Sequence, residues 1–76
     1  MLYRRIKELR TDADLTQKKI AEQLHCSQQV YSNYELGIRD LPTDILIKLA
    51  NIHNVSTDYI LGITDNPKQS KSVHKK

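Results

Sequence analysis

The sequence predicts an all-α fold of five short helices, and three features of its 76 residues lead to that prediction. Apolar residues recur at spacings of three and four, which is the period of an amphipathic helix. Serine or threonine stands directly before several of these runs, where a helix N-cap is expected. The chain has only two glycines and two prolines, too few turn-forming residues for a fold of many short strands.

The first two helices are predicted over residues 2–13 and 16–24. Thr16 is expected to cap the second helix, because its hydroxyl can accept a backbone N–H of the next turn. Leu15 before that cap and Ile20 four residues after it occupy the positions of a hydrophobic staple. The apolar face of the first helix, with spacings of 4, 3 and 4, consists of Leu2, Ile6, Leu9 and Ala13.

The other three helices also carry start and stop signals. Ser27 is expected to cap the third helix, and Gly37 to end it. Pro42 stands where a helix can begin without losing a hydrogen bond. Ser56 is expected to cap the fifth helix, which would end at Gly62. The core face of the fourth helix is predicted to be Ile45, Leu46, Leu49 and Ala50.

Composition divides the chain into one domain, residues 1–65, and a flexible basic tail, residues 66–76. The tail is polar and has no helical period. The formal net charge of +3 is uneven, with +2 on residues 1–39, −3 on residues 40–67 and +4 on residues 68–76. The high isoelectric point therefore comes from the tail, and it is weak evidence for nucleic-acid binding.

The sequence contains no pattern typical of catalysis, metal binding or membrane insertion. His25, His53 and His74 are scattered and, with the single Cys26, lack metal-ligand spacing. No nucleophile–histidine–acid set and no glycine-rich phosphate loop are found, so we expect no enzyme, no metal and no cofactor. The N-terminus lacks a long apolar run, and one cysteine cannot form an internal disulfide; both fit a cytoplasmic protein.

The link between the second and third helices is only two or three residues long, which predicts a helix-turn-helix. In that motif one helix can lie in the major groove of DNA while the other crosses the phosphate backbone. Amides and hydroxyls also occur on ordinary solvated faces, but the short turn favours DNA contact. An amide both donates and accepts hydrogen bonds, so it can pair with adenine bidentately. The third helix presents uncharged side chains of this kind opposite its apolar side: Gln28, Gln29, Ser32 and Asn33.

Four segments, LTQKKIAEQL, SQQVYSNYELG, LP and VSTDYILG, resemble in their order the Cro/C1-type (XRE) helix-turn-helix family, the phage-repressor-like DNA-binding domains. The likeness covers about residues 3–63. It implies a lambda-repressor-like fold with the helix-turn-helix at helices two and three. It also implies a transcriptional regulator, most often a repressor, that binds double-stranded operator DNA as a homodimer on two related half-sites. No small-molecule ligand is evident.

The resemblance implies roles for individual residues. The base-reading positions would be Gln28, Gln29, Ser32 and Asn33. The resemblance and the free N–H groups at helix starts together suggest phosphate contacts by Thr16, Gln17, Lys18, Ser27, Tyr31 and Arg39, with further charge from Arg4 and Lys19. Arg10 and Glu35 would form a partly buried ion pair between the first and third helices. Tyr31 stands where the family often has Ile or Val, and its hydroxyl is expected to reach the rim.

The sequence departs from the family pattern at the turn and after the third helix. His25 stands where relatives often have glycine, so the turn must use a conformation that a non-glycine residue tolerates or accept strain. Leu36 replaces a polar residue common in relatives.

Two questions stay open at this stage. Three isoleucines would either be partly exposed or line a dimer contact: Ile47, Ile52 and Ile63. The alternative function is an antitoxin-like or other protein-interaction module on the same fold, for which only the lysine tail could wrap a partner.

Overall fold

The computed structural model describes residues 3–69, and within this range it contains five α-helices and no strand. The predicted all-α fold class is confirmed. None of these helices is long and apolar enough to cross a lipid bilayer. The helices are α1 (Arg4–Asp12), α2 (Gln17–Leu24), α3 (Gln28–Leu36), α4 (Thr43–His53) and α5 (Thr57–Leu61).

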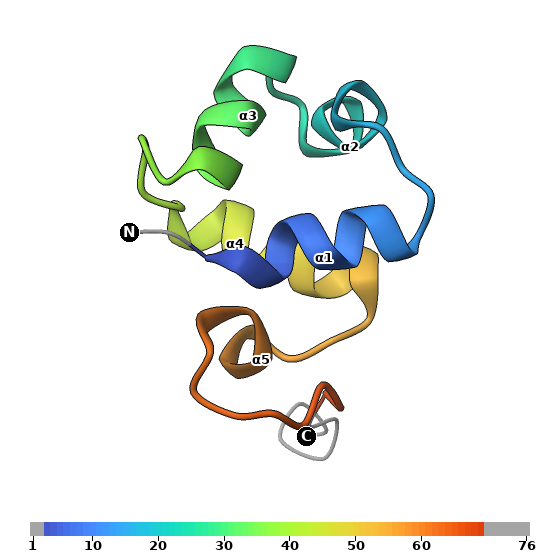
Figure 1. Cartoon of the computed structure of the whole chain (residues 1–76), viewed down its shortest axis with the longest axis vertical. Helices are drawn as coiled ribbons and strands as arrows, with labels where there is room; N and C mark the ends of the chain where they lie inside the picture. The colour runs from blue at the N-terminus through green and yellow to red at the C-terminus, as the bar shows by residue number, and fades with distance from the viewer. Residues whose placement is uncertain (1–2, 70–76) are drawn as a thin grey trace.

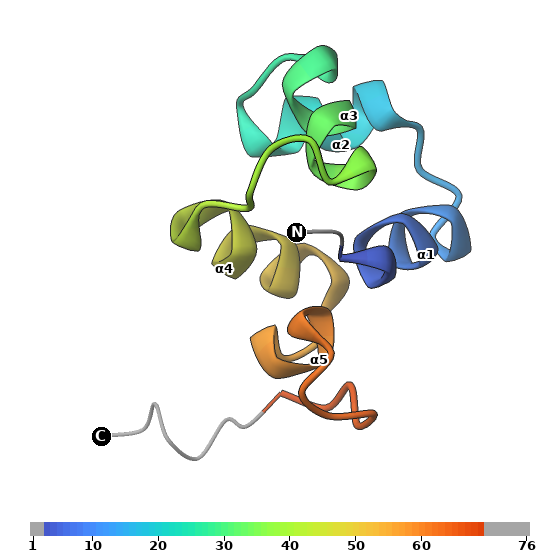
Figure 2. The ribbon, with the colours of Figure 1, turned by 60° about the vertical axis from the view of Figure 1, so that its left-hand side comes forward.

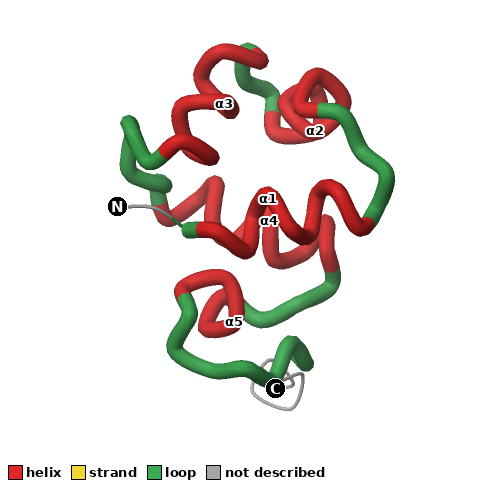
Figure 3. Tube along the Cα trace, in the orientation of Figure 1, coloured by secondary structure: helices red, strands yellow, loops and turns green. Residues whose placement is uncertain are grey.

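The helices are arranged in three tiers along the long axis of the molecule (Figure 1). α2 and α3 lie together at one end, α1 and α4 cross the middle, and α5 lies at the other end. The view turned by 60° keeps the same order (Figure 2). The loops between the helices are short (Figure 3), so the helices at each level are held close to one another. This arrangement leaves the outer side of α2 and α3 open to solvent.

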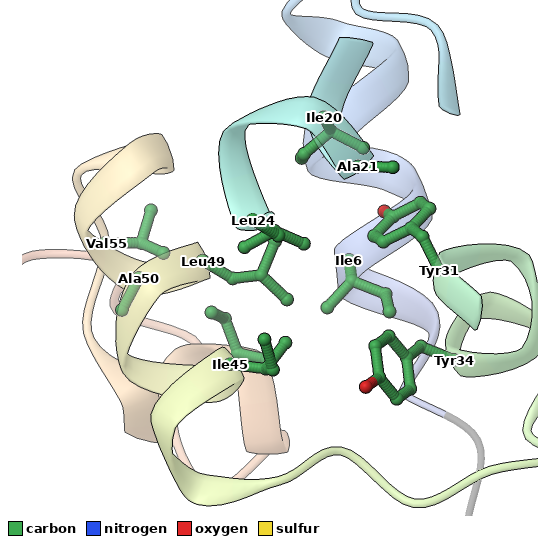
Figure 4. Packing of buried hydrophobic residues seen from close by; sticks show 11 residues of the cluster. Ile6, Ile20, Ala21, Leu24, Tyr31, Tyr34, Ile45, Leu49, Ala50 and Val55 are labelled. Atoms are coloured by element: carbon green, nitrogen blue, oxygen red, sulfur yellow. The ribbon is translucent and has the colours of Figure 1, made fainter. Parts of the chain in front are cut away.

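The core fills the space between the helices and draws on all five of them. Its buried side chains include two tyrosines from α3, which meet aliphatic residues from α1, α2 and α4 (Figure 4). At about 25 cal/mol per Å² of apolar surface removed from water, burial of such side chains is the main favourable contribution to folding. The core residues are Ile6, Ile20, Ala21, Leu24, Tyr31, Tyr34, Ile45, Leu49, Ala50, Val55 and Ile60.

The three predicted N-caps are confirmed. Thr16 Oγ1 accepts the N–H of Lys19 at 3.0 Å, and Ser27 Oγ accepts that of Val30 at 3.1 Å. Ser56 Oγ accepts a backbone N–H at the start of α5, also at 3.0 Å. Each cap contributes about 1 kcal/mol to stability. Pro42 takes the N-cap position of α4 with an extended backbone, rather than the first helical position.

All five helices end in the same way, and the sequence showed only two of these ends. A residue in the left-handed conformation follows each helix, and the next residue donates its N–H to a carbonyl five residues earlier, as in a Schellman motif. Glycine takes the left-handed position after α3 and α5, as predicted. The left-handed residues are Asp14, His25, Gly37, Asn54 and Gly62.

The end of α1 differs from the prediction for this reason. Asp14 has φ 58°, which turns the chain before a fourth apolar position is reached. Ala13 is therefore an exposed C-cap and not part of the core face. Leu15 packs against the core instead, and its N–H bonds to the carbonyl of Arg10 at 3.0 Å. Leu2, the other end of the predicted face, lies outside the described residues.

A segment after α5 folds back along the domain. Arg5 of α1 donates to the carbonyl of Tyr59 and to the carboxylate of Asp65, both at 2.7 Å. Gln69 Nε2 donates to the carbonyl of Val55 at 2.9 Å, and the N–H of Ser56 bonds to a carbonyl of the same returning segment. The predicted boundary between residues 65 and 66 stays a prediction, and residues 70–76 of the predicted tail lie outside the described residues.

Candidate nucleic-acid interface

The turn between α2 and α3 is built on a left-handed histidine. His25 has φ 59° and ψ 40°, the left-handed conformation. Glycine adopts this conformation without steric cost, whereas histidine carries a Cβ. Cys26 follows, half-buried against the core, and donates its backbone N–H to the carbonyl of Ala21 at 3.0 Å. Burial raises the pKa of the Cys26 thiol, so the side chain acts as a small apolar residue. The turn thus forms with a non-glycine residue in the left-handed position.

One side of α3 is buried and the other carries the four predicted base-reading residues. Tyr31, Tyr34 and Glu35 face inward. Gln28 and Gln29 are exposed, and Ser32 and Asn33 are partly exposed beside them. Gln29 Nε2 donates to Asn33 Oδ1 at 3.1 Å, which aligns these two amides along one stripe of the helix. The structure therefore brings the four side chains onto one face, and their contact with bases stays a prediction.

Most of the residues predicted to contact phosphate lie on the surface. Thr16 and Ser27 are exposed at the starts of α2 and α3, where backbone N–H groups and the helix dipole favour an anion. Both hydroxyls accept a capping hydrogen bond, and each keeps its own O–H to donate. The exposed cations from the predicted set and its supporting charges are Arg4, Lys18, Lys19 and Arg39.

Tyr31 corrects one of these predictions. Its side chain has no solvent exposure, so its hydroxyl cannot contact a phosphate in this conformation. The ring fills the core and stands edge-on to Tyr34, with 6.4 Å between the ring centroids. The hydroxyl makes no hydrogen bond of good geometry within the described residues. Burial, and then the neighbouring Glu35 carboxylate, raise the pKa of Tyr31, so the hydroxyl stays neutral.

The side chain of Gln17 makes a contact within the domain, and its predicted contact with phosphate stays a prediction. Its side-chain Nε2 donates to Glu35 Oε1 at 2.9 Å and points into the domain. The backbone N–H of Gln17, at the start of α2, has no acceptor within the helix. No local sequence pattern predicts this contact between Gln17 and Glu35, because the two residues are 18 positions apart.

The predicted ion pair between Arg10 and Glu35 is confirmed. Arg10 Nε lies 2.6 Å from Glu35 Oε2, and Nη2 lies 3.2 Å from Oε1, so the guanidinium binds both carboxylate oxygens. Arg10 Nη1 also donates to the carbonyl of Leu15 at 2.8 Å. Because Gln17 joins the same carboxylate, the network fixes α3 to α1 and to the start of α2.

The network also sets the charge of its members. Burial alone raises the pKa of Glu35, but the hydrogen bonds from Arg10 and Gln17, the neighbouring Tyr31 hydroxyl and the charge of Arg10 together lower it below its ordinary value. The hydrogen bond to Glu35 raises the pKa of Arg10. Both groups are therefore ionised at neutral pH, and α3 is anchored by a charge-assisted contact at its C-terminal half.

A tight turn between two short helices, the second of which exposes uncharged amides, defines a helix-turn-helix domain. The helix-turn-helix family model matches residues 6–60. The chain belongs to this family, which is the XRE-type family that its sequence resembles.

Three proteins of Bacillus subtilis strain 168 are similar to this chain. It is 46% identical to the HTH-type transcriptional regulator ImmR over 71 residues, which are 93% of this chain and 56% of ImmR. It is 39% identical to the uncharacterized HTH-type transcriptional regulator YobD over 88% of this chain and 60% of YobD. It is 38% identical to the SPbeta prophage-derived regulator YonR over 80% of this chain and 56% of YonR. The chain thus spans a little over half the length of these relatives.

Proposed function

We propose that this protein is a sequence-specific DNA-binding transcriptional regulator that acts as a repressor. The observation that carries the proposal is the exposed, uncharged amide and hydroxyl face of α3. A solvated helix face usually carries lysine and glutamate, whereas amides can distinguish base pairs in the major groove. The similarity to ImmR, YobD and YonR, all named HTH-type transcriptional regulators, supports the same class. The proposed location of such a regulator is the cytoplasm.

In this proposal α3 enters the major groove and α2 crosses the backbone. The side chains of Gln28, Gln29, Ser32 and Asn33 select the base pairs. The phosphate contacts, which hold the domain in register without reading sequence, come from Thr16, Lys18, Ser27 and Arg39 and from the backbone N–H of Gln17. Two copies of the chain bind a symmetric operator whose half-sites lie about one helical turn, roughly 34 Å, apart.

The test is selection from a random duplex library at roughly physiological salt, where non-specific phosphate binding is weak. We expect enrichment of a two-fold symmetric site. On that site, Gln28→Ala should weaken binding by about 1–3 kcal/mol for each half-site and relax the preference at one position in each. Gln23→Ala removes the same side chain from an exposed position of α2 and should change neither quantity.

Two outcomes would contradict the proposal. Binding that shows no enriched site and disappears as salt rises would mean that α3 does not read bases unaided. The antitoxin-like alternative would then be the better explanation, and recovery of a stable protein complex from the native host would test it. An operator preference that survives Gln28→Ala unchanged would mean that the reading face has been wrongly assigned.

A further inference from the structure

Two large apolar side chains are exposed at the C-terminal end of α3, next to the amide face. Leu36 is 63% exposed and Ile38 is 71% exposed. Within the described residues the other large exposed apolar side chains are Ile47 on α4 and Ile63 after α5. Leu36 and Ile38 are therefore a pair of neighbours, whereas the other two belong to separate elements.

The way α3 ends explains why Ile38 is not buried. In a Schellman motif the residue after the left-handed one packs against side chains in the last turn of its own helix. After α1, α2 and α4 this residue joins the core, because the last turn there offers Leu9, Ile20 or Leu49. After α3 the same positions hold Ser32 and Asn33. Ile38 therefore lies beside two predicted base-reading residues without an apolar partner in that turn.

Leu36 lies on the same stripe as the amides. It follows Gln29 by seven residues and Asn33 by three, and seven residues of α-helix return to within about 20° of the starting direction. The Gln29–Asn33 hydrogen bond marks this stripe directly. Seven residues advance about 10.5 Å along the helix axis, which is the length of roughly three base pairs. A helix that presents Gln29 to one base pair thus presents Leu36 to the same groove about three base pairs away.

We propose that Leu36, with Ile38 beside it, contacts the C5-methyl group of a thymine in the operator and so specifies that base. This inference rests on the proposed function, since it assigns a further specificity-determining residue to the same face. The thymine methyl is the apolar group that base pairs present in the major groove, and an apolar side chain is its matching contact. Leucine can satisfy no donor or acceptor of a base edge, so a cytosine or guanine at this position loses binding energy.

The test replaces thymine by deoxyuridine in the selected operator, one position at a time, because this change removes the methyl group and nothing else. We expect one position per half-site at which the replacement weakens binding of the wild-type protein by about fourfold, the value for one buried methyl. Leu36→Ala removes the contact in both half-sites, so it should weaken binding to the thymine operator by about the square of that factor, roughly sixteenfold. The variant should bind the thymine and deoxyuridine operators equally at that position.

The matched control is Leu61→Ala, the same substitution at the C-terminal residue of α5. Leu61 is partly exposed and lies at the end of the molecule opposite α3 (Figure 1). The variant should keep the full sensitivity to deoxyuridine. Sedimentation of both variants without DNA should give the same oligomeric state as the wild-type protein, since neither change is expected at a contact between copies.

Three outcomes would overturn the inference. One is an operator in which no single deoxyuridine weakens binding, and another is equal deoxyuridine sensitivity in Leu36→Ala and the wild-type protein. The third is a shift in oligomeric state with Leu36→Ala, which would make the apolar pair a contact between protein chains. If the wild-type protein selects no operator at all, the proposed function fails and the methyl contact with it. An operator without methyl dependence contradicts the methyl contact alone.

Discussion

At the scale of single residues, three non-glycine side chains hold left-handed backbone conformations. Asp14, His25 and Asn54 have φ values of 58°, 59° and 56°. Asparagine and aspartate tolerate this region because their short polar side chains can hydrogen-bond locally, whereas other residues lose about 1–2 kcal/mol there. The histidine in the helix-turn-helix is therefore the most strained of the three positions, and it lies in the turn that orients α3.

Replacing this histidine with glycine should stabilise the domain. We expect His25→Gly to raise the free energy of unfolding by about 1 kcal/mol in urea titrations, because glycine enters the left-handed region without a Cβ clash. Asn54→Gly should give a smaller gain. Gln23→Gly, inside α2, should lower stability by about 1 kcal/mol. A loss of stability in His25→Gly would mean that the imidazole makes a contact worth more than the backbone strain.

The buried hydroxyl of Tyr31 gives a second prediction at this scale. Because the side chain is fully buried, Tyr31→Phe should leave DNA affinity and its salt dependence unchanged. A hydroxyl buried without a good hydrogen bond contributes little to stability, so the free energy of unfolding should stay equal or rise by about 1 kcal/mol. Titration of the selected operator, with urea unfolding alongside, measures both. A tenfold loss of DNA affinity in a variant of unchanged stability would contradict this prediction and would support a contact between the Tyr31 hydroxyl and a phosphate.

At the scale of helices, local sequence signals predicted where elements begin better than where they end. Thr16, Ser27 and Ser56 lie next to the turns they cap, so their signal is contained in a few adjacent residues. The ends at Asp14 and Asn54 were missed because aspartate and asparagine serve equally well as caps, turn residues or solvated side chains. Glycine has fewer such roles, which is why the ends at Gly37 and Gly62 were predicted.

The position of a site residue was predicted correctly where it follows from local sequence, and not where it depends on tertiary contacts. The amide face of α3 follows from helical period alone, and the structure places its four residues together. The inward turn of Gln17 and the burial of Tyr31 depend on how α1 and α2 pack against α3, and no local pattern encodes that. The contacts of Arg5 with Tyr59 and Asp65 join residues more than 50 positions apart, so their discovery required the folded chain.

The network on Glu35 links three helices and predicts an acid-sensitive part of the stability. The pKa of Glu35 is lowered in the folded state, so its contribution is present above the unfolded value, about 4.3, and is lost as the pH falls through the folded value. Glu35→Gln leaves the guanidinium of Arg10, whose side chain is only 12% exposed, without its counter-charge and should lower stability by about 3 kcal/mol near pH 7.

Urea titrations from pH 7 to pH 2.5 measure this contribution. The difference in unfolding free energy between the wild-type protein and Glu35→Gln should be largest near neutral pH and should shrink below pH 4. The double variant Arg10→Met, Glu35→Leu removes both charges and should recover much of the loss, because apolar side chains of similar volume can replace a buried pair. A difference that stays constant with pH would show that the carboxylate charge is not what stabilises the contact.

At the scale of the whole molecule, exposed lysines lie at both ends of the domain. Lys18, in the first turn of α2, lies at the end that carries α3, whereas Lys68 belongs to the segment at the opposite end (Figures 1 and 2). Both lysines are exposed, so each can be replaced without disturbing the core. They therefore separate the effect of a phosphate contact from that of net charge.

Salt dependence should distinguish these two lysines. Each phosphate neutralised on DNA contributes about 0.9 to the slope of log K against log salt. Lys18→Ala should therefore reduce the magnitude of that slope by about 1.8 on the operator, about 0.9 for each of the two bound copies, and weaken binding to operator and random duplex alike. Lys68→Ala, which removes the same charge far from α3, should leave the slope unchanged. Gln28→Ala should also keep the slope while changing the preferred sequence, because it removes a base contact and no charge.

Equal slopes for both lysine variants, each below that of the wild-type protein, would mean that overall charge rather than contact at α2 determines DNA binding. The assignment of α2 to the phosphate backbone would then be wrong.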